Sequence, residues 1–350
     1  MLIKGRAPYS IVYQRRGDER NPPNARESGT GCFMKIIHLC SHAGGGVGTV
    51  LKGWLQKDNI NTHQVFSLEN MEDKRLFQGF SSVYENAQPV FIYDAIKEVD
   101  IVVVHFWDRP ILLQFLTRPL PSCRLIFWSH KNWNVPDKWI FFPDMFIDTS
   151  PIQSHKQYIW STGDISRFLE IKPIHHQGFN IGYIGTVDYT KIYRHFIRLF
   201  NSIKIPDVKF TIIGKNNTEH RSSGSIKFLG QVDDVAPYLA EMDLFFYPLR
   251  RDHYGTCEQS LGEAMAAGIP PVMIENPAES FIFYQGCYEE EKITSIVELL
   301  GQDGSLRKYA AIEAKIRARE LYSIDNMIAE WDSVFDDMMQ KEKRTHEYKG

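Results

Sequence analysis

Short apolar runs that alternate with stretches of helical spacing constrain the fold of this chain more than any other feature. Runs such as MKIIHLC, DIVVVHF and RLIFWSH are rich in β-branched and aromatic residues and are apolar on both faces. Strands of this kind, separated by helices, are typical of a parallel sheet that is covered by helices on both sides. The pattern therefore predicts an α/β protein.

The alternating pattern occurs in two series. It pauses near residues 171–178, where EIKPIHHQG contains Pro, Gly and His, and restarts with NIGYIGTV, KFTIIGK, IKFLGQV, DLFFYPL and IPPVMIE. A chain of 350 residues also exceeds one ordinary domain. We therefore predict two Rossmann-like, doubly wound domains that face each other across a cleft. Their expected bounds are 34–175 and 176–350, and the C-terminal helical runs are assigned to the second domain.

The first 33 residues differ from the rest of the chain. They are rich in Arg, Pro, Gly and Asn, show no sustained periodicity and lack the apolar core of a signal peptide. We expect residues 1–33 to be a disordered extension ahead of a natural start at Met34. A basic targeting arm is the alternative.

Composition limits the class of protein. Hydrophobic residues make up 43% and charged residues 24%, as in ordinary globular proteins. The net charge of −3 argues against a nucleic-acid partner. The five cysteines are scattered, without a C-x-x-C pair, which predicts a reducing cytosol rather than a disulfide framework or a zinc site. No apolar run reaches the roughly 18 residues that a membrane helix needs. We expect a cytoplasmic protein.

The loops that follow strands are the places to look for a ligand site, since ligands of open α/β sheets bind beyond the carboxyl ends of the strands. The first such loop, AGGGVGT, contains Gly45 and Gly46. Its glycines would let phosphates approach the backbone at a helix start. Thr49 stands where a dinucleotide fingerprint needs its third glycine, and no Lys-Ser/Thr of a Walker A loop follows. A tight strand-to-helix turn is the equal alternative.

Two further loops carry a basic or titratable side chain. His130 follows RLIFWSH directly, and Lys191 lies in GTVDYTK, near an expected helix start. A lysine there is a suitable partner for a diphosphate. Each residue alone is more often a structural or solvated side chain.

The stretch HYGTCEQSLGEAMAAGIPPV, residues 253–272, carries two glutamates. Thr256 and Gln259 have the spacing of a capping box, which predicts a helix start at Thr256 with Glu258 in its first turn. At 100° per residue, Glu258 and Glu263 lie about 140° apart, so they do not form a carboxylate pair. Glu263 stands among small and apolar residues. Ligand hydroxyls would supply the hydrogen-bond partners that it needs there.

This stretch resembles the signature of the retaining GT-B glycosyltransferases of family 4, the group 1 transferases. Their motif is a Glu, seven residues, then a Glu followed by Ala-Met-Ala-x-Gly-x-Pro-Val. Residues 263–270 match its second half, with the additional Pro271 before Val272. The resemblance extends from about Met34 to Met339. MKIIHLCSHAGGGVGTVL is similar to the family's first strand and glycine loop, and IGYIGTVDYTK to its diphosphate-binding strand and turn.

The resemblance implies roles for individual residues. Glu263 would accept hydrogen bonds from the ribose hydroxyls, and His130 would contact the donor sugar near the reacting centre. Lys191 would neutralise the diphosphate, aided by the backbone N–H groups of Gly45 and Gly46. The other donor-binding positions that it implies are Gly185, Thr186, Gly255, Thr256, Cys257, Glu258 and Glu279.

Two positions depart from the family pattern. Thr186 replaces the arginine that usually follows the glycine of the diphosphate strand. Gly255 stands where the first glutamate of the motif is expected. Glu258 from a reshaped loop is one candidate replacement. The group of Arg250, Arg251 and His253 is the other.

The expected activity is that of a retaining hexosyltransferase that moves a sugar from a nucleotide-diphosphate sugar to a glycan, lipid-linked or small-molecule acceptor. The resemblance implies a metal-independent reaction with no cofactor besides the nucleotide-sugar co-substrate, and the chain has no Asp-x-Asp motif. Envelope or exopolysaccharide biosynthesis is the expected setting.

The acceptor is expected to lie against the first domain. HKNWNVPDKWIFFPDMF, with Trp133, Trp139, Phe141 and Phe142, is a candidate acceptor platform or a peripheral contact with the inner face of a membrane. A core loop with an edge strand is the favoured reading of the same run.

Two other classes of protein stay open. Thr186 and Gly255 also fit a non-catalytic GT-B protein that binds a sugar nucleotide or a partner. The glycine loop, with Glu69 downstream, also fits an NAD-dependent oxidoreductase.

Overall fold

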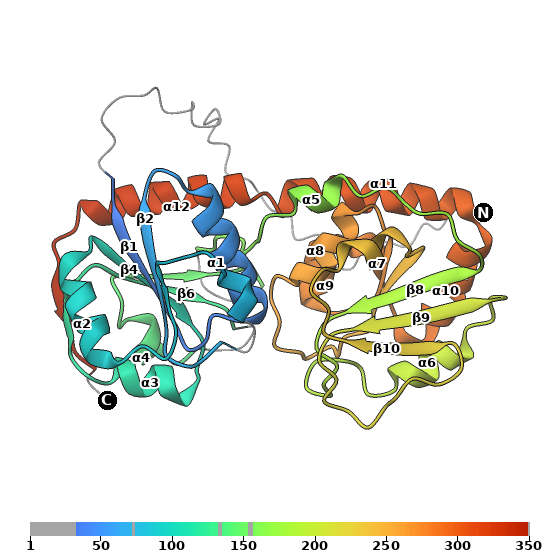
Figure 1. Cartoon of the computed structure of the whole chain (residues 1–350), viewed down its shortest axis with the longest axis horizontal. Coiled ribbons are helices and arrows are strands. Elements are labelled where there is room, and N and C mark those ends of the chain that lie inside the picture. The colour runs from blue at the N-terminus through green and yellow to red at the C-terminus, as the bar shows by residue number, and fades with distance from the viewer. Residues whose placement is uncertain (1–32, 72–73, 132–134, 153–156, 349–350) are drawn as a thin grey trace. The chain divides into compact units, whose positions relative to one another are not determined.

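The computed structural model describes residues 33–71, 74–131, 135–152 and 157–348. The predicted N-terminal extension lies outside the described residues except for Phe33, which is exposed. The described chain contains two six-stranded sheets (Figure 1).

The first sheet has the strand order β3-β2-β1-β4-β6-β7, and all of its pairings are parallel. Every residue of β4 and β6 is buried, because helices cover both faces. The strands are β1 Lys35–Cys40, β2 Thr62–Ser67, β3 Val83–Tyr84, β4 Ile101–Phe106, β6 Leu125–Ser129 and β7 Met145–Asp148. The intervening helices are α1 Gly45–Lys57, η1 Lys74–Phe77, α2 Pro89–Glu98, α3 Pro110–Leu116 and α4 Asp137–Ile140.

The second sheet repeats the design, with the order β10-β9-β8-β11-β12-β13 and parallel pairing throughout. Its strands are β8 Phe179–Ile184, β9 Val208–Ile213, β10 Ile226–Gly230, β11 Leu244–Tyr247, β12 Pro271–Ile274 and β13 Cys287–Tyr288. Its helices are α5 Ser166–Leu169, α6 Phe196–Ser202, α7 Ala236–Ala240, α8 Gln259–Ala266, α9 Pro277–Phe283, η2 Tyr284–Gly286, η3 Glu290–Lys292, α10 Ile293–Gln302 and α11 Gly304–Leu321. The two sheets confirm the predicted α/β fold class.

The last helix packs with the first sheet rather than the second. The sequence pattern groups α12 (Ile324–Met339) with the second series, yet its buried side chains join the core beside β1, β4 and β6. Trp331 lies 5.2 Å from the Trp54 ring and 5.1 Å from the Trp128 ring, measured between centroids. The following strand β14 (Arg344–His346) pairs antiparallel with β5 (Leu120–Cys123). The chain therefore returns to the core in which it started.

Two helix starts bear on the predicted ligand loops. Helix α1 begins at Gly45, inside the glycine loop, and Gly45 adopts a positive φ of 57° that glycine tolerates. In the run YTKIYRHFIRLFNSI the helix begins only at Phe196. Lys191 therefore lies in a loop rather than near a helix start. That loop is held to β11 by hydrogen bonds from Tyr193 N–H to the carbonyl of Pro248 and from Arg250 N–H to the carbonyl of Lys191.

The aromatic run after β6 is mainly core. Trp139 and Phe142 are buried in the cluster beneath the first sheet, whereas Phe141 is 78% exposed. Trp133 lies outside the described residues. The favoured reading of this run as a core loop holds for Trp139 and Phe142.

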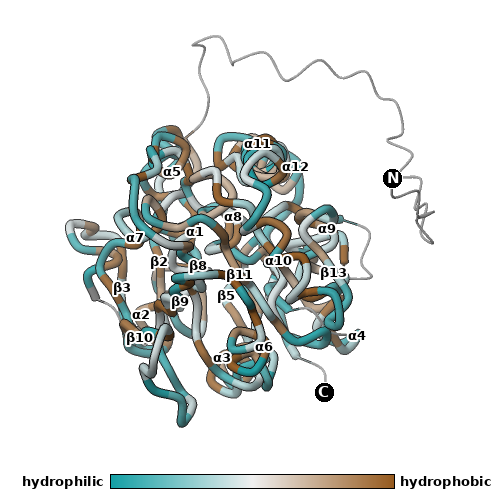
Figure 2. Tube along the Cα trace, turned by 90° about the vertical axis from the view of Figure 1, so that its right-hand side faces the viewer, coloured by the Kyte–Doolittle hydropathy of each residue, from teal (hydrophilic) through white to brown (hydrophobic). Residues whose placement is uncertain are grey.

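Polar segments follow the outside of the fold, as in the hydrophilic loop beside β10 in Figure 2. In the part of the chain that the structure describes, no helix combines the length and the apolar character needed to span a membrane. The described cysteines, Cys40, Cys123, Cys257 and Cys287, are all unbridged.

Candidate functional site

A buried ion pair forms where the loops after β8 and β11 meet. The ammonium of Lys191 lies 2.8 Å from Oε2 of Glu258, with the side chains 15% and 5% exposed. Tyr247, the last residue of β11, donates its hydroxyl hydrogen to the same carboxylate oxygen. The hydroxyl of Ser260 donates in turn to Tyr247, at 3.2 Å. These contacts place a lysine, a carboxylate and a phenol at the carboxyl edge of the second sheet, where α/β folds bind ligands.

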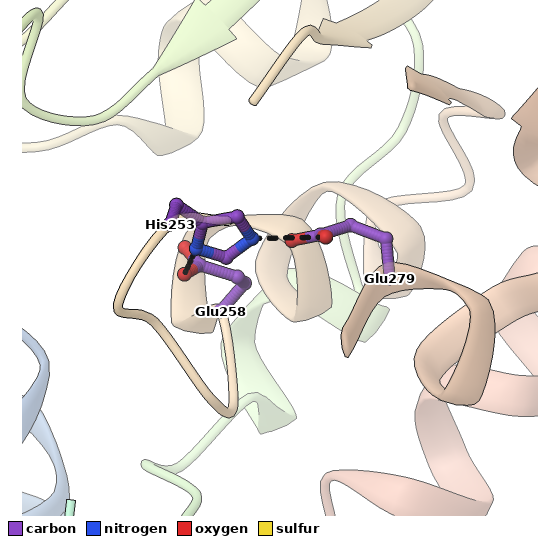
Figure 3. A group of neighbouring side chains, drawn as sticks. All are labelled: His253, Glu258 and Glu279. Carbon is purple, nitrogen blue, oxygen red and sulfur yellow. Dashed lines mark hydrogen bonds and ion pairs between the residues drawn. The ribbon is translucent and has the colours of Figure 1, made fainter. Parts of the chain in front are cut away.

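His253 extends this group toward a second carboxylate (Figure 3). Its Nε2 lies 3.0 Å from Oε2 of Glu279, and its Nδ1 lies 3.8 Å from Oε1 of Glu258. The backbone N–H of Gly255 donates to Nδ1 at 3.0 Å. Nδ1 is thus an acceptor, and Nε2–H donates to Glu279. The other oxygen of Glu279, Oε1, is buried and has no hydrogen-bond partner among the described residues.

We call Lys191, Tyr247, His253, Glu258 and Glu279 the charged cluster. Burial alone would lower the pKa of Lys191, but the Glu258 carboxylate outweighs it and holds the pKa above its ordinary value. Burial would raise the pKa of Glu258, yet Lys191 and His253 together keep it below its usual range. Burial and the neighbouring Glu258 charge raise the pKa of Tyr247 well above 10. Lys191 and Glu258 are therefore both ionised at neutral pH.

Opposing effects act on the pKa of His253. Burial lowers its pKa, but the attraction of Glu279 and the hydrogen bond to it are stronger, and the net shift is upward. His253, Glu258 and Glu279 also have the donor set of a metal site, with ligand atoms within 4.8 Å of one another. Lys191 already supplies the positive charge beside Glu258, and a cation would have to compete with it. The geometry favours an ion-paired cluster over a metal centre.

Gly255 and Glu258 share one small volume. A Cβ added at Gly255 would lie 1.8 Å from Oε1 of Glu258, which no pair of atoms tolerates. The carboxylate of Glu258 thus fills the space beside the position at which the motif has its first glutamate. Only glycine at position 255 leaves room for it.

The capping-box prediction at Thr256 is wrong. Helix α8 begins at Gln259, and Glu258 is its N-cap residue without a side-chain cap. The Gln259 amide donates to the carbonyls of Ser161 and Cys257 and accepts from the N–H of Gly163. It is therefore not available to cap its own helix. The late start lets Glu258 turn toward Lys191.

Glu263 lies apart from the charged cluster. It is half-buried on α8 between buried apolar neighbours and has no hydrogen-bond partner among the described residues. Burial raises its pKa to about 7, opposed by the charge of Arg167 and assisted by that of Asp234. A carboxyl group with a perturbed pKa and without a partner is a candidate for ligand contact. The structure agrees with the sequence in separating Glu258 from Glu263.

The residues just before α8 contact the loop after β7. The hydroxyl of Thr256 lies 3.0 Å from that of Thr149, and the thiol of Cys257 donates to the Thr149 carbonyl at 3.1 Å. Burial raises the pKa of the Cys257 thiol to about 12, so this sulfur is no nucleophile at neutral pH. These residues serve as packing contacts in this structure.

The predicted backbone positions lie in the turn after β8 and at the start of α1. A Cβ added at Gly214 would lie 2.1 Å from the carbonyl oxygen of Gly185, so these two turns touch. The carbonyl of Thr186 accepts a hydrogen bond from Tyr183 at 3.0 Å. A Cβ on Gly46 would meet Gln259 of α8 at 3.7 Å, an ordinary contact distance. Glu69, the residue that motivated the oxidoreductase alternative, pairs with Arg109 at 3.2 Å.

His130 belongs to the first sheet and not to the charged cluster. Its ring is buried, and its Nε2 lies 3.1 Å from Nδ1 of His105. Burial lowers its pKa to about 3, so the ring is neutral. The neighbouring Lys131 pairs with Asp108 at 2.6 Å.

Sequence reasoning missed part of the site. Tyr247 ends the apolar run LFFY and reads as a core residue, and Tyr183 in FNIGYI does likewise. The two rings stack at 5.4 Å beside the ion pair. A tyrosine at the last position of a strand, at the ligand-binding edge, is the signal that was available.

The two parallel-sheet halves place this chain in the GT-B class of folds. Residues 178–290, which contain the whole charged cluster, match the family model described as Glycosyl transferases group 1. No curated protein sequence matches the chain.

Solved structures share the fold at low sequence identity. A glycosyltransferase from Rickettsia africae ESF-5 has a TM-score of 0.71 at 12% identity, covering 89% of this chain and 100% of that one. Anabaena Alr3699/HepE in complex with UDP-glucose has a TM-score of 0.68 at 14% identity, covering 87% and 100%. Trehalose-6-phosphate synthase, from a study of enzymatic glycosyl transfer with retention, has a TM-score of 0.58 at 11% identity, covering 88% and 100%.

Proposed function

We propose that this protein is a GT-B glycosyltransferase that binds a nucleotide-diphosphate sugar at the charged cluster and transfers the sugar with retention of configuration. The observation that carries the proposal is the buried Lys191–Glu258 pair at the carboxyl edge of the second sheet, inside the segment that matches the group 1 model. The Anabaena neighbour was solved with UDP-glucose, which supports a nucleotide sugar as the donor.

Lys191 is the residue that would neutralise the leaving diphosphate. Its ammonium stays charged, and the low-polarity surroundings strengthen its attraction for an anion. The diphosphate would replace Glu258 as the ion-pair partner of the Lys191 ammonium. Glu258 would keep the hydrogen bond from the Tyr247 hydroxyl. Glu258 would thus hold the lysine in position until the donor arrives.

Glu263 would accept hydrogen bonds from the ribose hydroxyls. It has no protein partner among the described residues, and a raised pKa is the mark of a carboxyl group that lacks one. Hydroxyl donors would stabilise its ionised form and lower that pKa on binding. The nucleotide would then span α8 from Glu263 to the loop that precedes the helix.

Metal independence is part of the proposal. Lys191 supplies positive charge where a metal-dependent transferase would place a divalent cation. We further propose a glycan, lipid-linked or small-molecule acceptor on the first half of the chain, with peripheral contact at the inner face of a membrane. The exposed Phe141 is the part of the aromatic run that suits such a contact.

A donor panel tests the proposal. UDP, GDP, ADP and their common sugar conjugates would be added separately in a thermal-shift assay, with NAD as the test of the oxidoreductase alternative. A ligand at 100-fold excess over its Kd stabilises the fold by roughly 2.7 kcal/mol. We expect one nucleoside diphosphate to stabilise the wild type and to lose its effect in Glu263→Ala. Sugar release from that donor, without added metal and in EDTA, would establish turnover.

A second candidate is a sugar-nucleotide-binding protein that does not transfer. Lys191 is already neutralised by Glu258, and Thr186 supplies no second cation at the diphosphate turn. Donor binding with neither transfer nor hydrolysis would favour this candidate. Stabilisation by NAD alone would overturn both.

A further inference from the structure

Four consecutive strands of the first sheet each carry a histidine. His63 lies at the start of β2, His38 in the middle of β1, His105 near the end of β4 and His130 just after β6. All four rings are buried, and none of them belongs to the charged cluster. Histidine inside an otherwise apolar strand requires a hydrogen-bond partner at each polar ring atom.

Strand register puts the four rings on one face in a diagonal line. His63 pairs with Ile36, two residues before His38, and His38 pairs with Val103, two residues before His105. His105 pairs with Trp128, two residues before His130. Since side chains alternate with a period of two, each step keeps the same face and moves toward the carboxyl edge.

The rings are hydrogen-bonded end to end. His63 Nδ1 lies 2.9 Å from His38 Nε2, and His38 Nδ1 lies 3.1 Å from His105 Nε2. His105 Nδ1 lies 3.1 Å from His130 Nε2, which leaves Nδ1 of His130 as the last atom of the line. That atom has no hydrogen-bond partner among the described residues.

A carboxylate starts the line at the other end. Oδ2 of Asp58 lies 2.9 Å from Nε2 of His63. Its Oδ1 accepts from the backbone N–H groups of Ile60 and Asn61, at 2.9 and 3.0 Å. Burial would raise the pKa of Asp58, but the hydrogen bonds from His63 and Asn61 lower it below the ordinary range. Asp58 is therefore an ionised acceptor, and Nε2 of His63 donates to it.

When all four rings are neutral, their hydrogen bonds can run in only one direction. If His63 is neutral with its hydrogen on Nε2, its Nδ1 must accept from Nε2–H of His38. The same argument applies to His105 and His130. Every ring carries its hydrogen on Nε2, and Nδ1 of His130 is a lone-pair acceptor.

One added proton reverses the direction of every hydrogen bond between the four rings. A proton bound at Nδ1 of His130 lets that ring pass its Nε2 proton to Nδ1 of His105, and His105 and His38 repeat the transfer. His63 ends as an imidazolium beside the Asp58 carboxylate. The other three rings are neutral again, each now with its hydrogen on Nδ1, so that His130 becomes a donor. His130, His105 and His38 each gain one proton and release one, His63 gains one and keeps it, and the net change is a single positive charge.

We propose that Asp58, His63, His38, His105 and His130 form a two-state proton relay that sets whether His130 accepts or donates a hydrogen bond at the carboxyl edge of the first sheet. Asp58 acts as a positioning residue, through three intervening rings. Of the four rings, only His63 lies beside a carboxylate that balances a charge.

The surroundings of the relay fit this assignment. Burial lowers the pKa of His38 and His105 well below 6.5, and His63 and His105 add repulsion at His38, as His130 does at His105. The charge is therefore excluded from the middle of the relay. Trp54 packs 4.7 Å from the His38 ring and Trp128 packs 4.9 Å from the His130 ring, which keeps water away from it.

Charged groups lie at both ends of the relay. At the His63 end, Asp332 of α12 accepts from Asn61, and Lys35, Asp94 and Glu98 line a surface cavity together with His63. This cavity gives the relay an outlet to solvent. At the other end Lys131, the next residue after His130, forms an ion pair with Asp108. Burial disfavours a positive charge on His130, and Asp58 favours one on His63.

A role for the relay in substrate binding rests on the proposed function. A sugar hydroxyl near His130 would find a hydrogen-bond acceptor in one state of the relay and a donor in the other. The relay itself does not depend on that function. Its behaviour in the protein without ligand therefore tests it separately from donor binding.

The test is a pH titration of the full chain, labelled with ¹⁵N in its histidines and followed by long-range ¹H–¹⁵N correlation spectra between about pH 5 and pH 9. We expect the four rings to share one midpoint. On acidification His63 becomes an imidazolium, while His38, His105 and His130 stay neutral and move their hydrogen from Nε2 to Nδ1. Separate midpoints, an imidazolium at any of these three rings or an unchanging spectrum overturns the relay.

Asp58→Asn is the decisive variant. Its Oδ1 stays bonded to two backbone N–H groups, so the amide nitrogen faces His63 and forces Nε2 to accept. We expect all four rings to carry their hydrogen on Nδ1 throughout, with loss of the transition. Asp144→Asn is the matched control, because Asp144, just before β7 of the same sheet, pairs with His346 at 3.3 Å outside the relay. A transition retained in folded Asp58→Asn, or lost in Asp144→Asn, overturns the role of Asp58. If Asp58→Asn does not fold, the wild-type titration decides.

Discussion

The two sheets have the same parallel topology, and each buries a set of polar side chains. The two sets are stabilised in different ways. In the first sheet, four rings with one carboxylate form a line with a single hydrogen-bond order. In the second, the Lys191 ammonium lies against the Glu258 carboxylate, and His253 lies between Glu258 and Glu279 at the sheet edge. The comparison teaches that buried polar groups are tolerated when they hydrogen-bond to one another or when charges of opposite sign lie together.

The largest expected effect comes from breaking the ion pair. Lys191→Met leaves the buried Glu258 carboxylate without its counter-charge and should cost about 3–5 kcal/mol of the free energy of unfolding. The double variant Lys191→Met with Glu258→Gln removes both charges and should recover most of that loss. Urea unfolding of the three proteins measures it. Equal losses in the single and double variants would contradict charge balance as the organising feature.

A smaller loss is expected when the histidine line is cut. His105→Leu leaves Nδ1 of His38 and Nε2 of His130 unpaired, but it strands no charge, and should cost about 2–3 kcal/mol. His175→Leu, on an exposed residue, should change stability by less than about 0.5 kcal/mol. The same urea series gives both values. A cost for His105→Leu above that for Lys191→Met would reverse the contrast between the two sheets.

Glu263 gives a prediction of opposite sign. Its pKa in the folded protein is about 7, above the ordinary 4.5, so the folded state holds the proton more tightly and stability falls as pH rises from about 4.5 to 7. Glu263→Gln should remove that slope and stabilise the protein by about 2 kcal/mol at pH 8. Thermal unfolding at pH 4 and pH 8 measures it. A variant with the wild-type slope would show that Glu263 is not the source.

The smallest effect concerns the shared volume of Gly255 and Glu258. Gly255→Ala pushes the Glu258 carboxylate off Lys191 and should cost about 1–2 kcal/mol. Gly304→Ala, where an added Cβ meets Arg307 only at 3.9 Å, is the tolerant control.

The exchange Gly255→Glu with Glu258→Ala moves the carboxylate to the motif position and should restore pairing with Lys191. Retained nucleotide binding in the exchange variant would show that the two positions are equivalent. Loss of binding with an intact fold would argue that Glu258 has a role of its own.

The sequence predicted the strands better than the site. Buried parallel strands are apolar runs bounded by polar turns, and such runs can be identified from the sequence alone. The start of α8 could not be predicted in this way, because the Gln259 amide is hydrogen-bonded to residues about a hundred positions earlier in the chain. The sequence also did not predict that α12 packs against the first sheet. Local periodicity shows that a helix has an apolar face, but not which of two apolar surfaces it packs against.

Site chemistry was predictable residue by residue but not as a set. Lys191, Glu258 and Glu279 were all candidates, yet their joining through His253 and Tyr247 depends on the loop geometry after β11. The histidine line was visible as one histidine in or just after each of four strands. Only the two-residue stagger of the strand register reveals that the rings meet.

The most direct test of the central claim is calorimetric titration of the wild type and of Lys191→Met/Glu258→Gln with the nucleoside diphosphate that the donor panel selects. The double variant removes the ammonium together with its counter-charge at Glu258, so that no unpaired charge is left at this pair. The account predicts binding to the wild type and at least a tenfold weaker affinity in the double variant, which is about 1.4 kcal/mol. Equal affinity in both proteins, or no binding of any nucleoside diphosphate to the wild type, would contradict it.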